Sequence, residues 1–432
     1  MKRIFATIFV FALMLSTTAF SQGWTYQGYF PDSTNAKGNT GAHGVAVSPD
    51  GTVWMQFYGA TDSVLQADGT YGHTRAVYSY NADGTQKFAP IKTVTVGGVT
   101  DTLWNSFRGM RADNNGNILF ASYNTLYRLD YKTGEGMDKL VYVGGTLTAP
   151  AVDAAGDVFV GPVIPGNPIQ VFGSDFSALG NAIDTSVGYS RTLEVSADGN
   201  TIYWAGYTNN AIFEYQRSDE FSPYVLIDTV LKGFACESIG WNHKTGYLWA
   251  STGSLAGGLP NNYAGATTAY TYPTWYAIDT QDWTIKDSIN WHYYQEGDDA
   301  RPRGIDFSPD GNTAYVCCFG ASTYPAFEKF TRPATDVQQQ SNGVVTDYKL
   351  SQNYPNPFNP TTEISYSVAK AGFVSLKVYD MLGREVATLV NSEKATGNYT
   401  VNFNATNLAS GTYIYQLQVN GVMLTKKMSL LK

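Results

Sequence analysis

The sequence is poor in the side chains that most often bind metals or act as catalysts. Its 432 residues include three cysteines and four histidines, and charged residues make up only 15% of the chain. No cysteine or histidine has a partner at the spacing of a zinc site. There is also no G-x-S-x-G elbow, no H-E-x-x-H pair and no glycine loop typical of phosphate binding. The sequence therefore carries no signature of a catalytic centre.

Positive charge is scarce as well, and it is not clustered. Lys and Arg together number 28 against 36 Asp and Glu, which gives a net charge of −8 and a pI near 5.0. A protein that binds nucleic acid needs a basic surface to attract the phosphates. Nucleic acid is therefore not an expected partner of this chain.

Long hydrophobic runs are absent except at the N-terminus. Two basic residues precede the apolar stretch Ile4–Leu15. The small residues Ala19 and Ser21 then form a cleavage site before Gln22, which predicts a secretory signal peptide over residues 1–21. The alternative is an uncleaved anchor, but the run is shorter than the about 18 residues that a spanning helix needs. The mature chain is expected to have no transmembrane segment.

The three cysteines, Cys236, Cys317 and Cys318, are an odd number for an exported chain. A disulfide between Cys236 and one of the other two is one interpretation. Buried free thiols are the favoured one, because cysteine often serves as a small core residue. Cys317 and Cys318 are adjacent on one expected strand, so their side chains should point to opposite faces.

The residues that are abundant favour β-structure. The chain has 31 tyrosines and 43 glycines, a composition typical of short strands joined by tight turns. From Tyr348 onward, apolar and polar residues alternate regularly, and Asn420-Gly421 marks a tight hairpin. Residues 348–432 are therefore predicted to form a small Ig-like β-sandwich. A polar linker at 336–347 should precede it.

This C-terminal part carries four segments that occur together. They are LSQNYPNPFNPTT from Leu350, VSLKVYDMLGREVATLV from Val374, GNYTVNFNATNLASGTYIYQLQVNG from Gly397 and the terminal KKMSLLK. On these segments, residues 348–432 resemble the C-terminal sorting domain of type IX secretion cargo. The resemblance implies that the type IX machinery carries the protein across the outer membrane to the cell surface or the medium. An ordinary adhesion-type sandwich is the alternative.

Residues 22–335 contain an internal repeat. Each copy has a leading residue, a short strand, a turn that ends in glycine and a second apolar strand. The leading residues of the six copies are His43, Arg108, Thr148, Arg191, Glu237 and Arg303. Further strands follow in each interval, and one such sheet cannot bury both of its faces alone. We therefore expect an all-β body in which the sheets pack around an axis as a six-bladed β-propeller.

Two other folds are compatible with the repeat: a propeller with a seventh, degenerate blade and a parallel β-helix. The sixth copy has only three strands, and we expect residues 22–30 to supply the fourth. Insertions at 61–73 and 255–273 account for the two longest intervals. The copies resemble NHL, YVTN and gluconolactonase-type propeller repeats, a resemblance that implies the fold and little about activity.

The leading residues should surround the mouth of the central channel, because the innermost strands of a propeller begin at one face. The candidate ligand-binding residues are His43, Arg108, Arg191, Glu237 and Arg303. Arginine binds carboxylates and phosphates through its planar fork, so this set predicts an anionic or hydroxyl-rich ligand. The alternative is that each arginine pairs with a carboxylate of a neighbouring blade. Three further histidines, at positions 73, 243 and 292, have no partner spacing.

A second layer is expected three residues further along each first strand. Its acidic members, Glu194 and Asp306, are candidates either for partners of the arginines or, with Glu237, for a Ca²⁺ site. Gluconolactonase-type enzymes use such a metal, so a calcium-dependent hydrolase is one hypothesis, although His43 stands where that family has glutamate. The favoured hypothesis is a non-catalytic binding or scaffold module for a glycan, a small anion or a protein. A purely structural surface component is the third.

Overall fold

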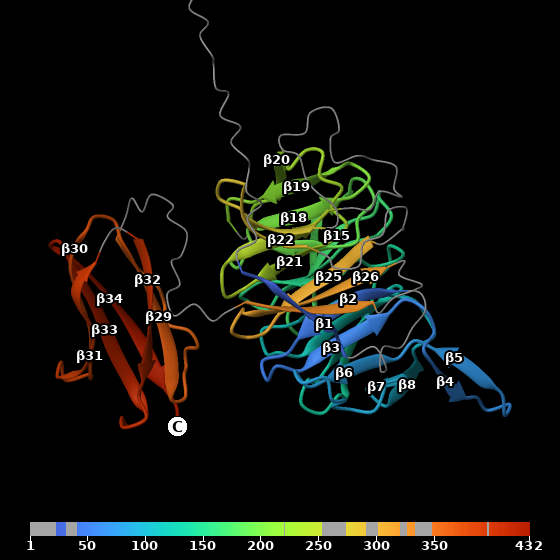
Figure 1. Ribbon diagram of the computed structural model, residues 1–432, viewed down its shortest axis with the longest axis horizontal. Coiled ribbons are helices and arrows are strands. Elements are labelled where there is room, and N and C mark those ends of the chain that lie inside the picture. The colour runs from blue at the N-terminus through green and yellow to red at the C-terminus, as the bar shows by residue number, and fades with distance from the viewer. Residues whose placement is uncertain are drawn as a thin grey trace, which may run out of the picture. The chain divides into compact units, whose positions relative to one another are not determined.

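The computed structural model describes residues 23–31, 41–219, 221–252, 274–290, 301–319, 326–332, 348–394 and 397–432. The chain divides into two compact units, here termed the body (Met1–Pro333) and the tail (Ala334–Lys432) (Figure 1). The regular elements of the described residues are all β-strands, which confirms the all-β prediction. None of these residues lies in a helix that could cross a membrane. The predicted signal peptide, linker and 255–273 insertion lie outside the described residues.

The described part of the body is a series of six antiparallel sheets. The first contains β2 (Ala42–Val47), β3 (Val53–Phe57) and β6 (Val77–Tyr80). The second contains β9 (Phe107–Ala112), β10 (Ile118–Ser122), β11 (Thr125–Leu129) and β12 (Gly136–Val141). The third contains β13 (Ala151–Val152), β14 (Val158–Val160), β15 (Ile169–Phe172) and β16 (Ala178–Ile183).

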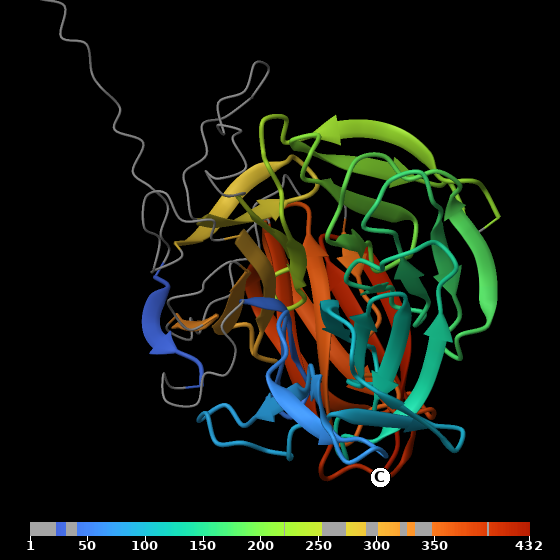
Figure 2. The ribbon, with the colours of Figure 1, turned by 90° about the vertical axis from the view of Figure 1, so that its right-hand side faces the viewer.

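The remaining three sheets repeat the same order of strands. The fourth contains β17 (Leu193–Val195), β18 (Thr201–Gly206), β19 (Ala211–Gln216) and β20 (Val225–Val230). The fifth contains β21 (Ile239–Asn242), β22 (Tyr247–Ser251), β23 (Thr274–Asp279) and β24 (Thr284–Asn290). The sixth contains β25 (Arg301–Phe307), β26 (Thr313–Phe319), β27 (Phe327–Thr331) and the N-terminal β1 (Thr25–Tyr29). The sheets follow one another in chain order around the body (Figure 2).

The N-terminal strand completes the last sheet. β1 pairs antiparallel with β27, with Tyr26 opposite Phe330 and Tyr29 opposite Glu328. This confirms the prediction that the segment at residues 22–30 supplies the fourth strand of the sixth copy. The first and last parts of the body are thereby hydrogen-bonded to each other.

Aromatic residues at the two ends of β1 contact sheets on either side. The Trp24 ring lies 5.9 Å from the Trp249 ring of the fifth sheet, and its indole N–H donates to Asp287 at 2.8 Å. Phe30 packs against Tyr315 at 4.8 Å and against Tyr80 of the first sheet at 6.2 Å. β1 therefore bridges the fifth, sixth and first sheets.

Two hairpins extend the interval between the first and second repeats. β4 (Asp62–Leu65) pairs with β5 (Tyr71–Thr74), which places a hairpin on the insertion expected at 61–73. A second hairpin of β7 (Thr93–Val96) and β8 (Val99–Thr102) was not expected from the sequence. Its turn, Gly97-Gly98, has two positive φ angles of 59° and 78°, the geometry that a two-glycine turn supplies. The long interval therefore reflects two insertions rather than one.

A recurring polar turn joins the first two strands of several sheets. Gly51 has φ of 81°, and its N–H donates to the Ser48 carbonyl at 2.8 Å. The Asp50 carboxylate accepts from the Ser48 hydroxyl at 2.8 Å and from the Thr52 N–H at 3.1 Å. Ser196-Ala-Asp-Gly199 and Ser308-Pro-Asp-Gly311 repeat these contacts. Such local hydrogen bonds explain why the repeat was readable from sequence.

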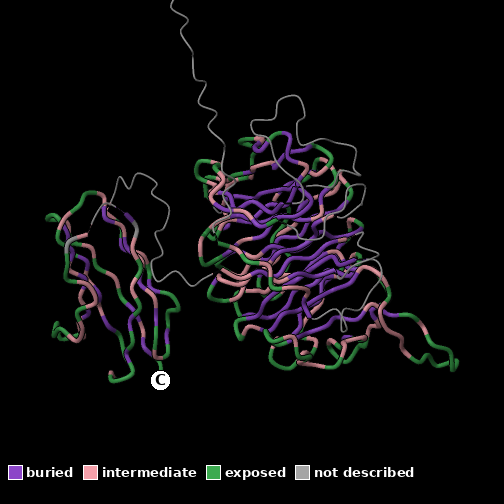
Figure 3. The backbone as a smooth tube through the Cα atoms, viewed as in Figure 1, coloured by how far each residue is buried: buried purple, intermediate pink, exposed green. Residues whose placement is uncertain are grey.

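The core of the body is divided among six apolar clusters, one between each pair of consecutive sheets and one between the sixth and the first. Trp54, Phe107 and Phe120 lie between the first and second sheets. Cys317, with Val45 and Met55, lies between the sixth and the first, and Cys318 lies between the fifth and the sixth. All three cysteines are buried and unpaired, as favoured from sequence. Figure 3 shows the buried strands of the body in purple.

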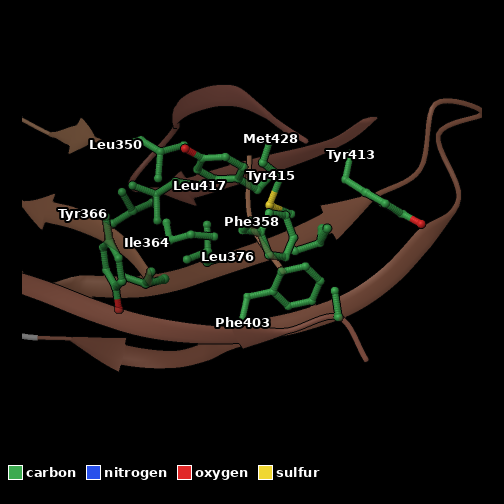
Figure 4. Close-up of a cluster of buried hydrophobic side chains, with 14 of the residues drawn as sticks. Leu350, Phe358, Ile364, Tyr366, Leu376, Phe403, Tyr413, Tyr415, Leu417 and Met428 are labelled. Atoms are coloured by element: carbon green, nitrogen blue, oxygen red, sulfur yellow. The ribbon is translucent and has the colours of Figure 1, made fainter. Parts of the chain in front are cut away.

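The tail is a two-sheet sandwich. One sheet contains β28 (Lys349–Leu350), β29 (Thr361–Val368) and β32 (Gly397–Asn404). The other contains β31 (Glu385–Lys394), β30 (Gly372–Tyr379), β33 (Gly411–Val419) and β34 (Val422–Leu430). Alternate residues of both sheets form one core, in which Ile364, Leu376 and Tyr415 are fully buried (Figure 4). The period-two pattern of the sequence is thus satisfied by sheet-on-sheet packing.

The proline-rich start of the tail is anchored by one of its two aromatic residues. Phe358 is buried in the sandwich core. The second, Tyr354, has a side chain that is 75% exposed. Its backbone forms two hydrogen bonds of 2.9 Å with Glu363. Tyr354 therefore contributes to the start of the tail through backbone pairing and not through its ring.

Candidate functional site

The structure places the predicted ligand-binding residues close enough together for their charges to affect one another. Burial lowers the pKa of His43 well below its ordinary value, and the positive charges of Arg303, Arg108 and Arg191 lower it further. Burial likewise lowers the pKa of Arg303 to about 10, while Glu237 acts in the opposite direction. His43 is therefore neutral. These five residues, from five of the six sheets, are here termed the axial cluster.

Three members of the axial cluster stand at β-bulges. In the first sheet, Ala42 pairs with Phe57 and Gly44 with Gln56, so His43 is the extra residue. Arg108 is skipped in the same way between β9 and β10, and Arg303 between β25 and β26. A bulge turns a side chain out of the regular alternation of the strand and often does so beside functional sites. The bulges stand at the equivalent position of three first strands.

A glycine follows each of these bulged residues and allows the first strands to approach closely. A Cβ atom at Gly109 would lie 2.4 Å from Cβ of Ala149. One at Gly44 would lie 2.9 Å from the backbone nitrogen of Met110. Any larger residue would force the neighbouring first strands apart. The glycines thus allow the leading residues of adjacent sheets to lie near one another.

The arginines of the axial cluster are only partly neutralised. Arg303 lies 2.8 Å from Glu237, and both side chains are buried. Neither Arg108 nor Arg191 forms an ion pair with any residue that the structure describes. The alternative prediction, that each arginine pairs with a neighbouring carboxylate, therefore fits Arg303 alone. Three guanidinium groups share one carboxylate, an arrangement that leaves net positive charge.

Aromatic rings that sequence reasoning missed stand beside these cations. The guanidinium of Arg108 lies 5.5 Å from the Tyr58 ring, Arg191 lies 5.3 Å from Tyr207 and Arg303 lies 5.2 Å from Phe319. Each ring belongs to the residue that ends or follows the second strand of a repeat. The aligned copies show this in TVWMQFY, NILFASY, NTIYWAGY and NTAYVCCF, which end at Tyr58, Tyr123, Tyr207 and Phe319. This recurring aromatic residue is the feature of the sequence from which the rings beside the arginines could have been predicted.

The second layer lies where the sequence placed it, but its charges are paired differently. Arg111 donates from Nε to Glu194 Oε1 at 2.8 Å, and its other nitrogens donate to the carbonyls of Met110 and Ile239. Asp306 accepts from the backbone N–H groups of Val47 at 2.8 Å and Phe307 at 2.7 Å. Glu194 is therefore a partner of Arg111, and Asp306 is satisfied by backbone donors.

The calcium hypothesis gains no support from this geometry. Among the residues that the structure describes, no group of three or more Asp, Glu, His or Cys side chains is placed to hold a metal. Glu194 and Asp306 as calcium ligands stay a prediction. His73 is exposed on the β4–β5 hairpin and His243 in the turn after β21, apart from the axial cluster, and His292 lies outside the described residues.

The buried second layer should make the stability of the body depend on pH. Burial raises the pKa of Glu194 to about 7 and that of Asp306 to about 6. A carboxyl group whose pKa is raised by folding stabilises the folded state. This contribution is complete at pH values below the pKa of the group in the unfolded state, and it is lost as pH rises through the pKa of the group in the folded state. Glu194→Gln removes one titration and keeps the acceptor for Arg111.

We expect the free energy of unfolding of the wild type to fall relative to Glu194→Gln as pH rises from about 4 to about 7. For a shift of this size the relative loss is about 3 kcal/mol. Urea denaturation of both proteins across this range measures it. A difference that does not change with pH would mean that Glu194 does not titrate there. Glu135→Gln, at an exposed position, is the matched control.

Comparison with known proteins identifies the tail. Residues 352–430 match the family model described as the secretion system C-terminal sorting domain, which confirms the predicted sorting domain. The match indicates export and a cell-surface or extracellular location by type IX secretion. A search of the curated proteins gives no match.

Similarity to solved structures is distant. The extracellular domain assigned to the one component system BT4673 of B. thetaiotaomicron aligns with 96% of this chain at 11% identity and a TM-score of 0.43. The chain spans only 59% of that protein. A luciferin-regenerating enzyme aligns with 69% of this chain and 94% of its own at 12% identity and a TM-score of 0.45. These likenesses do not bear on the ligand or the activity.

Proposed function

We propose that this protein is type IX secretion cargo whose body is a six-bladed β-propeller that binds an anionic ligand without catalysing a reaction. The sorting domain at 352–430 supports the first part, since such a domain marks an exported chain. A predicted signal peptide at 1–21 is consistent with the same route. The body is then what the cell delivers to its surface or to the medium.

The six apolar clusters support the closed propeller. Each sheet shares one cluster with the sheet before it and another with the sheet after it. The cluster between the sixth and first sheets, together with β1 on β27, joins the two ends of the series. A parallel β-helix would leave two free ends, and a seventh blade would add a seventh cluster. Six blades, with β1 as the outer strand of the last, account for every cluster.

The observation that carries the ligand hypothesis is the uncompensated charge of the axial cluster. Arg108 and Arg191 have no carboxylate partner among the described residues. Burial lowers the pKa of Arg108 and that of Arg303, and the positive charge of Arg191 lowers both further. Positive charges in a poorly solvated site repel one another, and a bound anion relieves the repulsion. Arginine side chains also supply the planar donors that carboxylates and phosphates accept. The chain contains no catalytic signature that would require an enzymatic alternative.

Small anions should therefore stabilise the body, and the effect should depend on the cluster. We expect millimolar citrate or sulfate at low ionic strength to raise the thermal midpoint of the mature chain. Binding at a hundredfold excess over Kd stabilises by about 2.7 kcal/mol. In Arg191→Gln the midpoint without anion should rise, because one like charge is gone, and the anion effect should disappear.

The matched control is Arg217→Gln, which also removes a guanidinium stacked on a tyrosine, here 4.9 Å from the Tyr224 ring. It should keep the full anion effect. Equal responses of the wild type and Arg191→Gln would contradict an anion site at the axial cluster. A Ca²⁺-dependent rise abolished by Glu194→Ala or Asp306→Ala would instead favour the calcium-dependent hydrolase.

A further inference from the structure

The axial cluster offers donors and an acceptor that no described residue satisfies. The Nε–H groups of Arg108, Arg191 and Arg303 have no hydrogen-bond partner, and the same holds for Nε2 of His43. Arg303 and His43 are only 7% and 3% exposed. A buried donor without a partner costs about 1–3 kcal/mol, so such a set is expected where a ligand completes it.

The acceptor is the carboxylate of Glu237. Its Oε2 lies 2.8 Å from Nη1 of Arg303 but has no hydrogen bond, because the two groups are not aligned for one. An ionised carboxylate can only accept hydrogen bonds. A ligand hydroxyl would supply the hydrogen bond that this oxygen lacks beside its ion pair with Arg303, while the arginines donate to the ligand.

Exposed tyrosines stand around the same site. Tyr123 is 46% exposed and has φ of 54°, a left-handed conformation that is unusual for an aromatic residue. The Tyr123 side chain lies near enough to Arg108 to contribute to the pKa of that arginine, which places it beside the cluster. Tyr189 is 42% exposed, and its ring lies 6.3 Å from that of Tyr207. The positive φ belongs to the two-residue turn between β10 and β11, in which Ser122 pairs with Thr125, and this turn holds the Tyr123 ring at the surface.

Taken together, these features select one class of ligand. We propose that the axial cluster binds a sugar acid, in which a carboxylate lies next to hydroxyl groups on a saturated ring. The carboxylate would accept from the guanidinium groups, and a neighbouring hydroxyl would donate to Glu237. The C–H face of the ring would pack on tyrosine, whose apolar surface and polar tip suit a ligand of this kind. This inference rests on the proposed anion-binding function and specifies its ligand.

Simpler anions lack part of this match. Phosphate in its dianionic form has one O–H donor, but it places additional negative charge against the Glu237 carboxylate and has no apolar face for the tyrosines. A short-chain carboxylate such as propionate satisfies the arginines but neither Glu237 nor the rings. A neutral sugar satisfies the acceptor and leaves the cationic groups unpaired. The relative affinities of a sugar acid, phosphate, propionate and a neutral sugar therefore show which groups of the site, the arginines, Glu237 or the tyrosines, contribute to binding.

The test is calorimetric titration of the mature chain with D-glucuronate, propionate, inorganic phosphate and D-glucose. We expect glucuronate to bind at least tenfold more tightly than each of the other three. Arg191→Gln should weaken glucuronate binding at least tenfold, whereas Arg217→Gln should leave it unchanged. A folded Arg191→Gln protein is verified by its thermal transition.

The outcomes separate this inference from the function on which it rests. If glucuronate, propionate and phosphate bind equally and all are lost in Arg191→Gln, the site binds anions and the sugar-acid assignment is overturned. If none of the anions binds, or if binding is unchanged in Arg191→Gln, the proposed anion-binding function itself is overturned. Tight glucuronate binding that also weakens in Tyr123→Ala, an exposed position, supports both.

Discussion

Replacing Glu237 by glutamine is expected to lower the free energy of unfolding of the body by about 3–5 kcal/mol, the usual cost of removing one partner from a buried ion pair. The side chains of Arg303 and Glu237 are only 3% and 5% exposed, so water cannot replace the lost carboxylate. Arg191 adds to the repulsion on Arg303, and Glu237 is the one carboxylate paired in the axial cluster among the described residues. Urea denaturation of the mature chain measures the change.

A double-mutant cycle distinguishes this effect from simple loss of packing. Glu237→Gln combined with Arg303→Gln should recover much of the lost stability, because the unpaired buried charge is also removed. Glu194→Gln at pH 6 is a useful comparison, since burial raises the pKa of that carboxyl to about 7 and it is mostly neutral there. A double variant as unstable as the single one would show that charge is not the cause.

Shortening the aromatic residues of β1 is the second large expected effect. We expect Trp24→Ala and Phe30→Ala each to cost about 3–5 kcal/mol, the range for truncating a large packed aromatic. Trp24 packs on Trp249 and bonds Asp287, and Phe30 joins the first and sixth sheets. Loss of either contact loosens the junction between the last and first sheets.

Chemical denaturation with tryptophan fluorescence and far-ultraviolet circular dichroism measures this change. Thr25→Ala, on the same strand but exposed, should change the stability by less than about 0.5 kcal/mol. If Trp24→Ala and Phe30→Ala matched that control, β1 would be a peripheral strand and the closed propeller would lose its main support.

The charged residues of the axial cluster are expected to act on the stability of the fold in opposite directions. Glu237 stabilises the fold, whereas Arg108 and Arg191 are expected to destabilise it in the absence of ligand. Residues retained at a cost to stability are typical of binding sites, where a strained or charged arrangement is relieved by the ligand. The axial cluster therefore combines one structural ion pair with two arginines that have no ion-pair partner among the described residues.

Interactions between residues close together in the chain allow much of this fold to be predicted from the sequence. Turns such as Ser48-Pro-Asp-Gly51 form from hydrogen bonds among neighbouring residues, so their positions follow directly from the sequence. Alternation of apolar residues likewise defines the faces of the strands in the tail. The six repeats and their leading residues were found on these grounds, whereas the sorting segments were recognised by their resemblance to a known family. Residues near Thr25 were correctly expected to form the last strand.

Other features depend on contacts between residues far apart in the chain, which no local pattern encodes. Whether a bulge turns Arg108 toward its neighbours depends on the register of β9 against β10, and the close approach at Gly109 depends on a separate sheet. Distances between sheets decide that Arg303 pairs with Glu237 and that Nε of Arg191 has no hydrogen-bond partner. Repeat and turn chemistry thus defined the units, and packing between the units decided which charges meet, because burial and Coulomb interactions act through space rather than along the chain.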